Sequence, residues 1–340
     1  MLMGLNIAPI TIAEQTISQI EVNQPKSPLG DPVYDLLIIA PNAFAGMLEA
    51  LVDHKNDIGI ETLLVTLELI YAESPGRDKA EQVKYYIKYA IEEWGIRYVL
   101  MVGGMKHQGP GWHAPIRYVD MDDGWEHHYL SDLYFADIYD SEGNFSSWDS
   151  DNDGIYAEWP HEELPEDINI DLIPDVAVGR LPVRNKLEVI IMVQKIIQYE
   201  RNANGQPWFN DIVLIAGDTY PEFLNANWTG YEGEEYADEA LSYLTGFNPT
   251  KLYTSNGNLT GPQVVIDTIS QGCGLLYFVG HGNPMTWGNH PPNNKTFVTG
   301  LSVDHIPKLK NGDKQPICVV SGCHNSQFDV SIFRILDSLA

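Results

Sequence analysis

The fold of this chain is decided by the stretch Gly274-Leu275-Leu276-Tyr277-Phe278-Val279-Gly280-His281-Gly282. Five consecutive apolar residues closed by glycine are typical of a strand that is buried in a parallel sheet. A second stretch repeats this pattern, Pro316-Ile317-Cys318-Val319-Val320-Ser321-Gly322-Cys323-His324-Asn325. In open parallel α/β sheets, functional residues lie beyond the carboxyl ends of the strands. We therefore expect His281 and Cys323 to meet at one edge of a sheet.

A histidine and a cysteine delivered to the same edge favour a cysteine hydrolase. An imidazole beside a thiol can hold it as the attacking thiolate and can later protonate the leaving amine. Gly322 would permit a sharp turn that exposes the sulfur, and the backbone N–H groups of Gly282 and Cys323 are the expected oxyanion donors. Side chains of adjacent turn residues rarely point at each other, so we expect His324, together with Trp287, in the wall of the substrate cleft.

Apolar runs alternate with periodic segments along most of the chain. The runs predict strands at 35–40, 61–67, 212–216, 275–279 and 317–320, with two more after Gly95 and from Val176. The periodic segments predict helices at about 46–55, 78–94, 186–201, 231–244 and 261–271. This alternation favours an α/β fold of the flavodoxin-like kind, with helices on both faces of a mostly parallel sheet.

The length of the chain, 340 residues, allows two subdomains. We expect an N-terminal extension at 1–30, an N-terminal α/β subdomain at 31–182, and a C-terminal α/β subdomain at 183–340 that carries the histidine and the cysteine. Between about 107 and 172 the regular pattern gives way to aspartates, tryptophans, tyrosines and glycines without a sustained period. That region predicts a long acidic functional insertion instead of core.

Two further stretches extend the pattern, Glu93-Trp94-Gly95-Ile96-Arg97-Tyr98-Val99-Leu100-Met101-Val102-Gly103-Gly104 and Ile173-Pro174-Asp175-Val176-Ala177-Val178-Gly179-Arg180-Leu181-Pro182-Val183. Together with the first two, they resemble the gingipain family of cysteine peptidases, of the caspase-like clan, over roughly residues 31 to 330. The resemblance implies a caspase-like fold and an endopeptidase that acts through a thioester acyl-enzyme, with cleavage after Arg or Lys.

The same resemblance implies two features beyond the pair itself. Asp175 falls where the family supplies an acidic residue that orients the catalytic histidine, although the aspartate is one methylene shorter than the family's glutamate. The family would also be expected to continue past Ala340 with further helices and often a β-sandwich.

The charge of the chain excludes several classes of partner. Twenty basic residues against forty-seven acidic ones give a formal net charge of −27, which repels nucleic acids and anionic lipid surfaces. No apolar run approaches the ~18 residues of a spanning helix, so membrane insertion is not expected. Only three cysteines occur, too few for a disulfide framework, and two of them, Cys273 and Cys318, are expected as buried residues inside strands. The expected partners are protein or peptide substrates.

An acidic stretch inside the insertion predicts a calcium site. In Asp149-Ser150-Asp151-Asn152-Asp153-Gly154-Ile155, carboxylates at positions one, three and five, glycine at six and a backbone carbonyl at seven match the first half of a calcium loop. Position twelve is Pro160, which excludes an EF-hand, and the expected residue to complete the ligand shell is Glu158, with Glu162 or Glu163 as alternatives. The alternative is a solvated acidic turn. Structural Ca²⁺ is thus the expected cofactor, and no organic cofactor is expected.

Two other function classes remain open from the sequence alone. One is a calcium-dependent binding or adhesion module with an inactive peptidase fold. The other is a metal-dependent hydrolase built from residues of the insertion, His107, His113, His127, His128 and Asp132. Four N-x-S/T sites at Asn144, Asn227, Asn258 and Asn294, together with the calcium loop, favour an extracellular or cell-surface location. Residues 1–30 do not have the pattern of a secretion signal, because no basic residue precedes Lys26.

Overall fold

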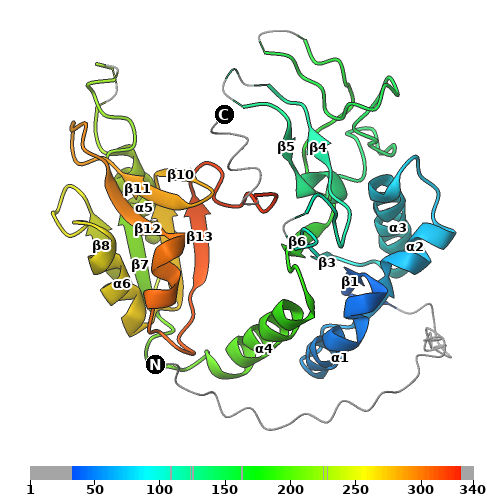
Figure 1. Ribbon diagram of the computed structural model, residues 1–340, viewed down its shortest axis with the longest axis horizontal. Helices are drawn as coiled ribbons and strands as arrows, with labels where there is room; N and C mark the ends of the chain where they lie inside the picture. Colours follow the sequence, from blue (N-terminus) through cyan, green and yellow to red (C-terminus); the bar gives the residue numbers. More distant parts are fainter. Residues whose placement is uncertain are drawn as a thin grey trace.

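A computed structural model describes residues 33–107, 109–122, 124, 126–161, 164–224, 226–227 and 229–330. The N-terminal extension expected at 1–30 lies outside these residues, and so do Glu162 and Glu163. The described chain forms two lobes, each built around a four-stranded sheet, and helix α4 (Lys186–Asn202) runs between them (Figure 1). Within the described part, no helix has both the length and the apolar composition needed to cross a membrane.

The first sheet has the strand order β2-β1-β3-β6, and all neighbouring strands are parallel. Its strands are β1 (Leu36–Ala40), β2 (Thr62–Thr66), β3 (Tyr98–Val102) and β6 (Ala177–Leu181). Because strand side chains alternate between faces, β1 feeds two cores. Leu36 and Ile38 pack with α1 (Asn42–Asp57) and α4, while Leu37 and Ile39 pack with α2 (Leu67–Glu73) and α3 (Lys79–Trp94).

The second sheet has the order β13-β9-β7-β8, again entirely parallel. Its strands are β7 (Asp211–Ala216), β8 (Asn248–Tyr253), β9 (Leu275–Val279) and β13 (Ile317–Ser321). Helix α5 (Glu232–Tyr243) covers one face, where Ala237 packs with Leu214, and α6 (Pro262–Gln271) covers the other, where Val265 packs with Ile215. The predicted α/β fold with helices on both faces of mainly parallel sheets is confirmed.

A small antiparallel sheet follows β9 without a break. It consists of β10 (His281–Asn283), β11 (Thr286–Asn289) and β12 (Val298–Ser302), and is followed by a 3-10 turn, η2 (Val303–Lys308). This sheet was not expected from the sequence. It folds the chain back over the carboxyl edge of the second sheet, at the position of the predicted catalytic histidine.

The insertion contains little regular structure: a two-stranded ribbon of β4 (Tyr118–Val119) and β5 (Tyr129–Leu130), and a 3-10 turn, η1 (Asp132–Phe135). Contrary to the prediction, part of it is core. Tyr134 and Phe135 are fully buried in the first lobe, and so is Lys84 of α3, whose ammonium lies 4.3 Å from the Tyr134 ring centroid and donates to the Ser146 carbonyl. Burial lowers the pKa of Lys84 to about 7.

Of the two cysteines that were expected to be buried, one is buried and the other is exposed. Cys273 is fully buried, and burial raises the pKa of its thiol to about 12. Cys318, in contrast, is exposed. Strand β13 is the edge strand of the second sheet, and Ile317 and Val319 on it are also about half exposed, so its apolar sequence does not imply burial here.

Candidate active site

The register of two neighbouring strands brings His281 and Cys323 to the same edge, as predicted. In the parallel pair β9 and β13, Val279 pairs with Ser321, and the Gly280 N–H donates to the Ser321 carbonyl at 3.0 Å. His281 and Cys323 each follow two residues later. Their loops touch, since a Cβ placed on Gly282 would lie 2.6 Å from the Cys323 carbonyl oxygen.

His281 is oriented by a backbone carbonyl. Its Nε2 lies 2.7 Å from the carbonyl oxygen of Thr219, which follows the carboxyl end of β7. Because a carbonyl only accepts, Nε2 carries the proton and Nδ1 keeps its lone pair. The rings of Tyr220 and His290 pack edge-on against the imidazole, with centroid distances of 6.3 and 5.7 Å. The half-buried ring is thus held in one tautomer and one orientation.

Asp175 has different partners from those expected. Its carboxylate accepts the backbone N–H groups of Ile138 and Tyr139 at 2.7 and 2.9 Å, and within the described chain it makes no hydrogen bond to His281. The physical reason lies in the topology. Asp175 precedes β6, so it lies at the amino end of a strand in the first sheet, whereas His281 follows the carboxyl end of a strand in the second.

Cys323 is exposed, and its turn is shaped by the next residue. His324 has φ +55°, in the left-handed region. Its Nε2 lies 2.7 Å from Glu126 Oε1, and its Nδ1 lies 3.1 Å from Gln327 Oε1. His324 therefore points across to the insertion. Trp287 packs its ring 4.7 Å from that of Phe278, against the core of the second lobe.

A cavity of about 560 Å³ lies beside the cysteine turn. One wall comes from the insertion, at Glu126 and residues 127–130, and the other comes from Gly322 and residues 324–329. Of the two residues expected in the wall of a substrate cleft, His324 lines this cavity and Trp287 does not. The cavity is large enough to receive a side chain.

Two residues of this edge were not expected from the sequence. Thr219 acts through its main chain, so its side chain carries no signal; only its place just beyond β7 could have indicated it. Asn325 follows Cys323 by two residues, and its side-chain amide fills the space beside Gly282, where a Cβ would lie 1.9 Å from Nδ2. The absence of a side chain at Gly282 therefore lets the two loops close on each other.

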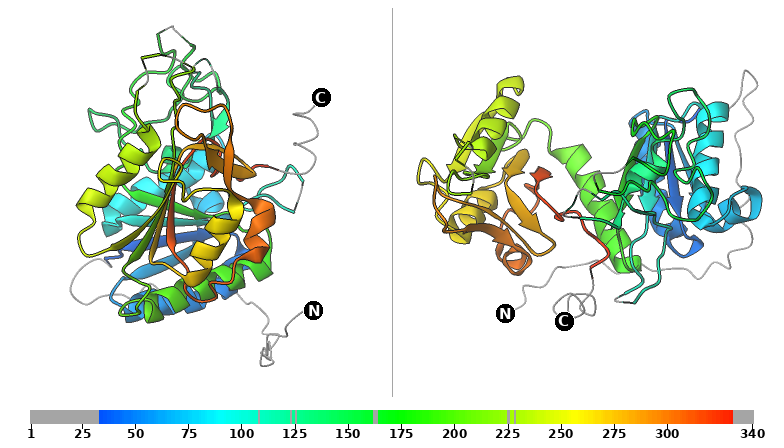
Figure 2. Two further views of the ribbon diagram at one scale, coloured as in Figure 1. Left: turned by 90° about the vertical axis from the view of Figure 1, so that its left-hand side faces the viewer. Right: turned by 90° about the horizontal axis from the view of Figure 1, so that it is seen from above.

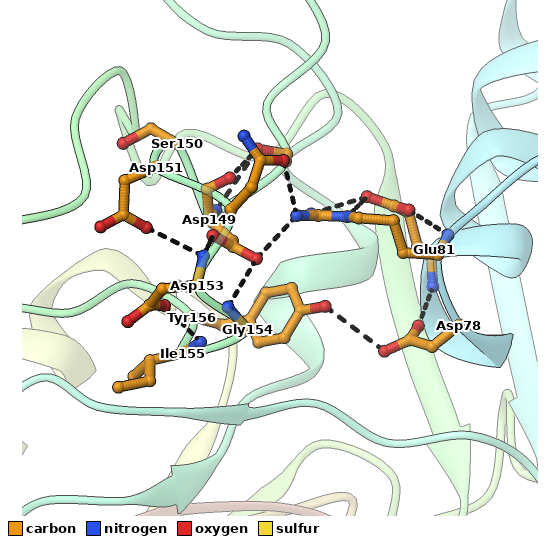
Figure 3. Close-up of polar contacts among 12 residues, drawn as sticks. Asp78, Glu81, Asp149, Ser150, Asp151, Asp153, Gly154, Ile155 and Tyr156 are labelled. Carbon is orange, nitrogen blue, oxygen red and sulfur yellow. Dashed lines mark hydrogen bonds and ion pairs between the residues drawn. The ribbon is translucent and has the colours of Figure 1, made fainter.

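Three aspartates of the predicted calcium loop lie close together. Carboxylate oxygens of Asp149, Asp151 and Asp153 lie within 4.8 Å of one another (Figure 3). Asp149 is 2% exposed, and Arg77 Nη1 lies 2.6 Å from its Oδ2. Loss of hydration and then neighbouring carboxylates, among them Asp153, raise the pKa of Glu158, which shows that Glu158 adds to the same negative region.

The histidines of the insertion do not converge on a metal. Among the described residues, the three aspartates of the loop are the one group of three His, Cys, Asp or Glu side chains with metal-binding spacing. His113 Nε2 contacts the Arg184 carbonyl, and Asp132 is paired with Arg180 at 2.6 Å. These contacts give no support to the metal-dependent hydrolase considered from the sequence.

Comparison with known proteins gives the family. The sequence model of peptidase family C25 matches residues 30–339. No curated protein sequence matches the chain. Several solved structures share the fold, two gingipain structures among them. The complex of the Porphyromonas gingivalis RgpB pro- and mature domains has a TM-score of 0.60 at 19% identity, covering 88% of this chain and 57% of that one.

The second structure, the Arg-specific cysteine proteinase gingipain R (RgpB), has a TM-score of 0.61 at 20% identity, with coverage of 88% and 58%. At this identity the likeness concerns the fold, and the chain spans less than three fifths of either relative. The family match covers nearly all of the described residues and includes both strands of the site. The chain therefore belongs to peptidase family C25, the gingipain family.

Proposed function

We propose that this protein is a cysteine endopeptidase in which Cys323 is the nucleophile and His281 the base. The proposal rests on one observation: the register of β9 and β13 delivers the imidazole and the thiol to one sheet edge in a chain of a cysteine peptidase family. The exposed Cys323 contrasts with the buried Cys273, whose raised pKa keeps its thiol protonated.

The geometry supports a two-step mechanism. His281 Nδ1 takes the proton of the Cys323 thiol, and the thiolate attacks the carbonyl carbon of the scissile bond. The backbone N–H groups of Gly282 and Cys323 would stabilise the resulting oxyanion. The imidazolium then protonates the departing amine, leaving a thioester, which water hydrolyses with His281 again as base. The Thr219 carbonyl accepts from Nε2–H throughout and so stabilises the imidazolium.

Cleavage after Arg or Lys is the proposed specificity. The cavity beside Cys323 includes Asp329, which is 5% exposed and whose Oδ2 accepts from the Tyr118 hydroxyl at 2.8 Å. A buried carboxylate at the wall of a substrate cavity favours a cationic side chain. The net charge of −27 also attracts basic peptides over longer distances.

The experiment compares Cys323→Ala, His281→Ala and the double variant on short Arg- and Lys-ester peptides. We expect each single variant to lose hydrolysis while keeping its fold, and the double variant to be little worse, because the two residues act as a unit. Full activity of a folded Cys323→Ala would refute the peptidase and leave a binding module as the better account. Loss of activity on EDTA treatment with unchanged Cys323 labelling would favour metal-dependent chemistry.

We further propose that Asp149, Asp151, Asp153, the Ile155 carbonyl and Glu158 hold a structural Ca²⁺. The supporting observation is that the oxygen atoms of three carboxylates lie close together. The charge of the buried Asp149 is balanced by an ion pair with Arg77. Bound calcium should raise the melting temperature with ion concentration, and magnesium should do so less. Glu92→Gln on α3, outside the loop, is the control and should keep this response to calcium. A melting curve unchanged across millimolar calcium, starting from metal-free protein, would indicate a solvated turn.

An extracellular or cell-surface location is part of the proposal. All four N-x-S/T asparagines, Asn144, Asn227, Asn258 and Asn294, are exposed, so each could accept a glycan without unfolding. Free calcium is abundant outside cells. Mapping of glycans on protein secreted from a glycosylating host would test the accessibility of these sites.

A further inference from the structure

The turn that carries Cys323 contains a strained residue. His324 has φ +55°, a conformation that costs energy for any residue with a Cβ and persists only where its surroundings hold it. The Gln327 N–H donates to the His324 carbonyl at 3.1 Å, which closes the turn locally. Any further contact that holds His324 in this conformation therefore also fixes the backbone of Cys323, one residue earlier.

The side chain of His324 is held from two directions. Its Nε2 faces a Glu126 carboxylate oxygen at 2.7 Å and its Nδ1 faces Gln327 Oε1 at 3.1 Å. The Glu126 carboxylate only accepts, so Nε2 of His324 donates to it, while Nδ1 faces the side-chain amide of Gln327. A hydrogen bond to a carboxylate is shorter and stronger than one between two neutral groups. Glu126 belongs to the insertion, far from Cys323 in sequence.

The rest of the segment after Cys323 is attached to the first lobe as well. The Tyr118 hydroxyl donates to Asp329 at 2.8 Å, and the rings of Trp112 and Phe328 meet edge-on at 5.9 Å. Cys323 itself follows β13 of the second lobe. The turn thus lies between the lobes, with its start fixed by one and its end by the other. Figure 1 and the right-hand view of Figure 2 show this segment in red between the lobes.

We propose that Glu126 is a positioning residue for the nucleophile: through the His324 side chain it holds the strained turn that directs the Cys323 thiol toward His281. This inference rests on the proposed function and adds to it a requirement for the insertion. The pair is only about 60% buried, with side-chain exposures of 39% and 41%. Such pairs contribute little to the free energy of unfolding, so its effect should appear in reactivity and not in stability.

The experiment measures two quantities in Glu126→Ala, Glu126→Gln and His324→Gly: kcat on an Arg-ester peptide, and the rate at which iodoacetamide alkylates Cys323, followed by peptide mass spectrometry. Iodoacetamide is small and neutral, so its rate reports the thiol independently of the substrate cavity. His324→Gly keeps the left-handed backbone available and removes the side-chain contacts with Glu126 and Gln327. Glu92→Gln on α3 makes the same change in an exposed pair with Lys88 and is the matched control.

We expect Glu126→Ala to lower both rates about tenfold with a nearly unchanged melting temperature. Glu126→Gln should lie between this variant and the wild type, because its amide oxygen still accepts. His324→Gly should match Glu126→Ala, and the double variant should be no worse than either, since the two residues act as one link. Glu92→Gln should behave as wild type.

Wild-type alkylation and turnover in Glu126→Ala, or in His324→Gly, would overturn the proposal. A double variant whose losses multiply would do the same, because it would show that the two side chains act separately. Cys323→Ala measured in parallel separates this failure from failure of the peptidase proposal. If Cys323→Ala still hydrolyses peptide, the proposed function fails, whereas the alkylation rates of the other variants still decide whether Glu126 controls the thiol.

Discussion

At the scale of single residues, the site depends on which group accepts the hydrogen bond from His281 Nε2. The carbonyl of Thr219 occupies that position at 2.7 Å. A backbone carbonyl carries no full charge, so it fixes the tautomer and stabilises the imidazolium less than a carboxylate would. Asp175, expected in this role from the family resemblance, instead holds two backbone N–H groups of the insertion. Its role in the structure is to attach the insertion to the start of β6.

Substitution of Asp175 tests this assignment. Asp175→Asn keeps one acceptor for the N–H groups of Ile138 and Tyr139, so we expect kcat within about twofold of wild type and a loss of unfolding free energy below about 1 kcal/mol. Urea unfolding and peptide hydrolysis on the same preparation measure both. A fall in kcat of tenfold or more in a folded variant would return Asp175 to the catalytic machinery.

The buried Lys84 makes a second prediction, on the pH dependence of stability. Burial lowers its pKa to about 7, while the unfolded chain keeps the ordinary value near 10.4. Between these values the unfolded state binds more protons, so the unfolding free energy rises with pH, with about 1 kcal/mol per pH unit from this group. Lys84→Met should lack this rise between pH 7 and 9, while Lys88→Met, one turn along α3, should keep it. Equal slopes of unfolding free energy against pH in wild type and Lys84→Met would contradict the lowered pKa of Lys84.

At the scale of elements, the sequence predicts the central parts of both sheets well. The strand expected at 275–279 is β9 as observed, and the helix expected to end at Gly95 does so, with Gly95 in the left-handed conformation at φ +69°. Long apolar runs and glycine ends are local signals, and they suffice there. The carboxyl-edge rule then places His281 and Cys323 together without any knowledge of tertiary contacts.

The strands that the sequence did not predict form through contacts with distant parts of the chain. Strand β8 begins with Asn248 and Pro249 and is half exposed, so it lacks an apolar run; pairing with β7 makes it a strand. The sheet of β10, β11 and β12 is rich in polar residues and glycine, and forms over the edge of the larger sheet. The Thr219 carbonyl and the link from Glu126 to His324 arise from contacts across more than sixty residues, which no local pattern encodes.

The contact between the two loops that carry His281 and Cys323 gives a prediction at this scale. In Gly282→Ala the new Cβ would lie 1.9 Å from Asn325 Nδ2 and 2.6 Å from the Cys323 carbonyl, so the cysteine turn must move. We expect kcat to fall at least tenfold. Gly300→Ala on β12 is the matched control, since its Cβ would meet nothing closer than 3.4 Å. Similar kinetics for both variants would show that the loops do not need this close approach.

At the scale of the whole molecule, the site is shared between the two lobes. The second sheet supplies Cys323, His281 and the Thr219 carbonyl, whereas the first lobe supplies Glu126 and Tyr118 through the insertion. The acidic insertion therefore contributes to the candidate site. It forms one wall of the cavity beside the cysteine turn, and it is packed into the core of the first lobe at Tyr134 and Phe135.

The central claim is that His281 activates Cys323, and the most direct measurement is iodoacetamide labelling of all three cysteines at pH 7, mapped by mass spectrometry in wild type and His281→Ala. We predict rapid labelling confined to Cys323 in the wild type, slower labelling at the exposed Cys318, none at the buried Cys273, and a fall in the Cys323 rate of at least tenfold in His281→Ala. Equal rates at Cys318 and Cys323, or a Cys323 rate unchanged by His281→Ala, would contradict it.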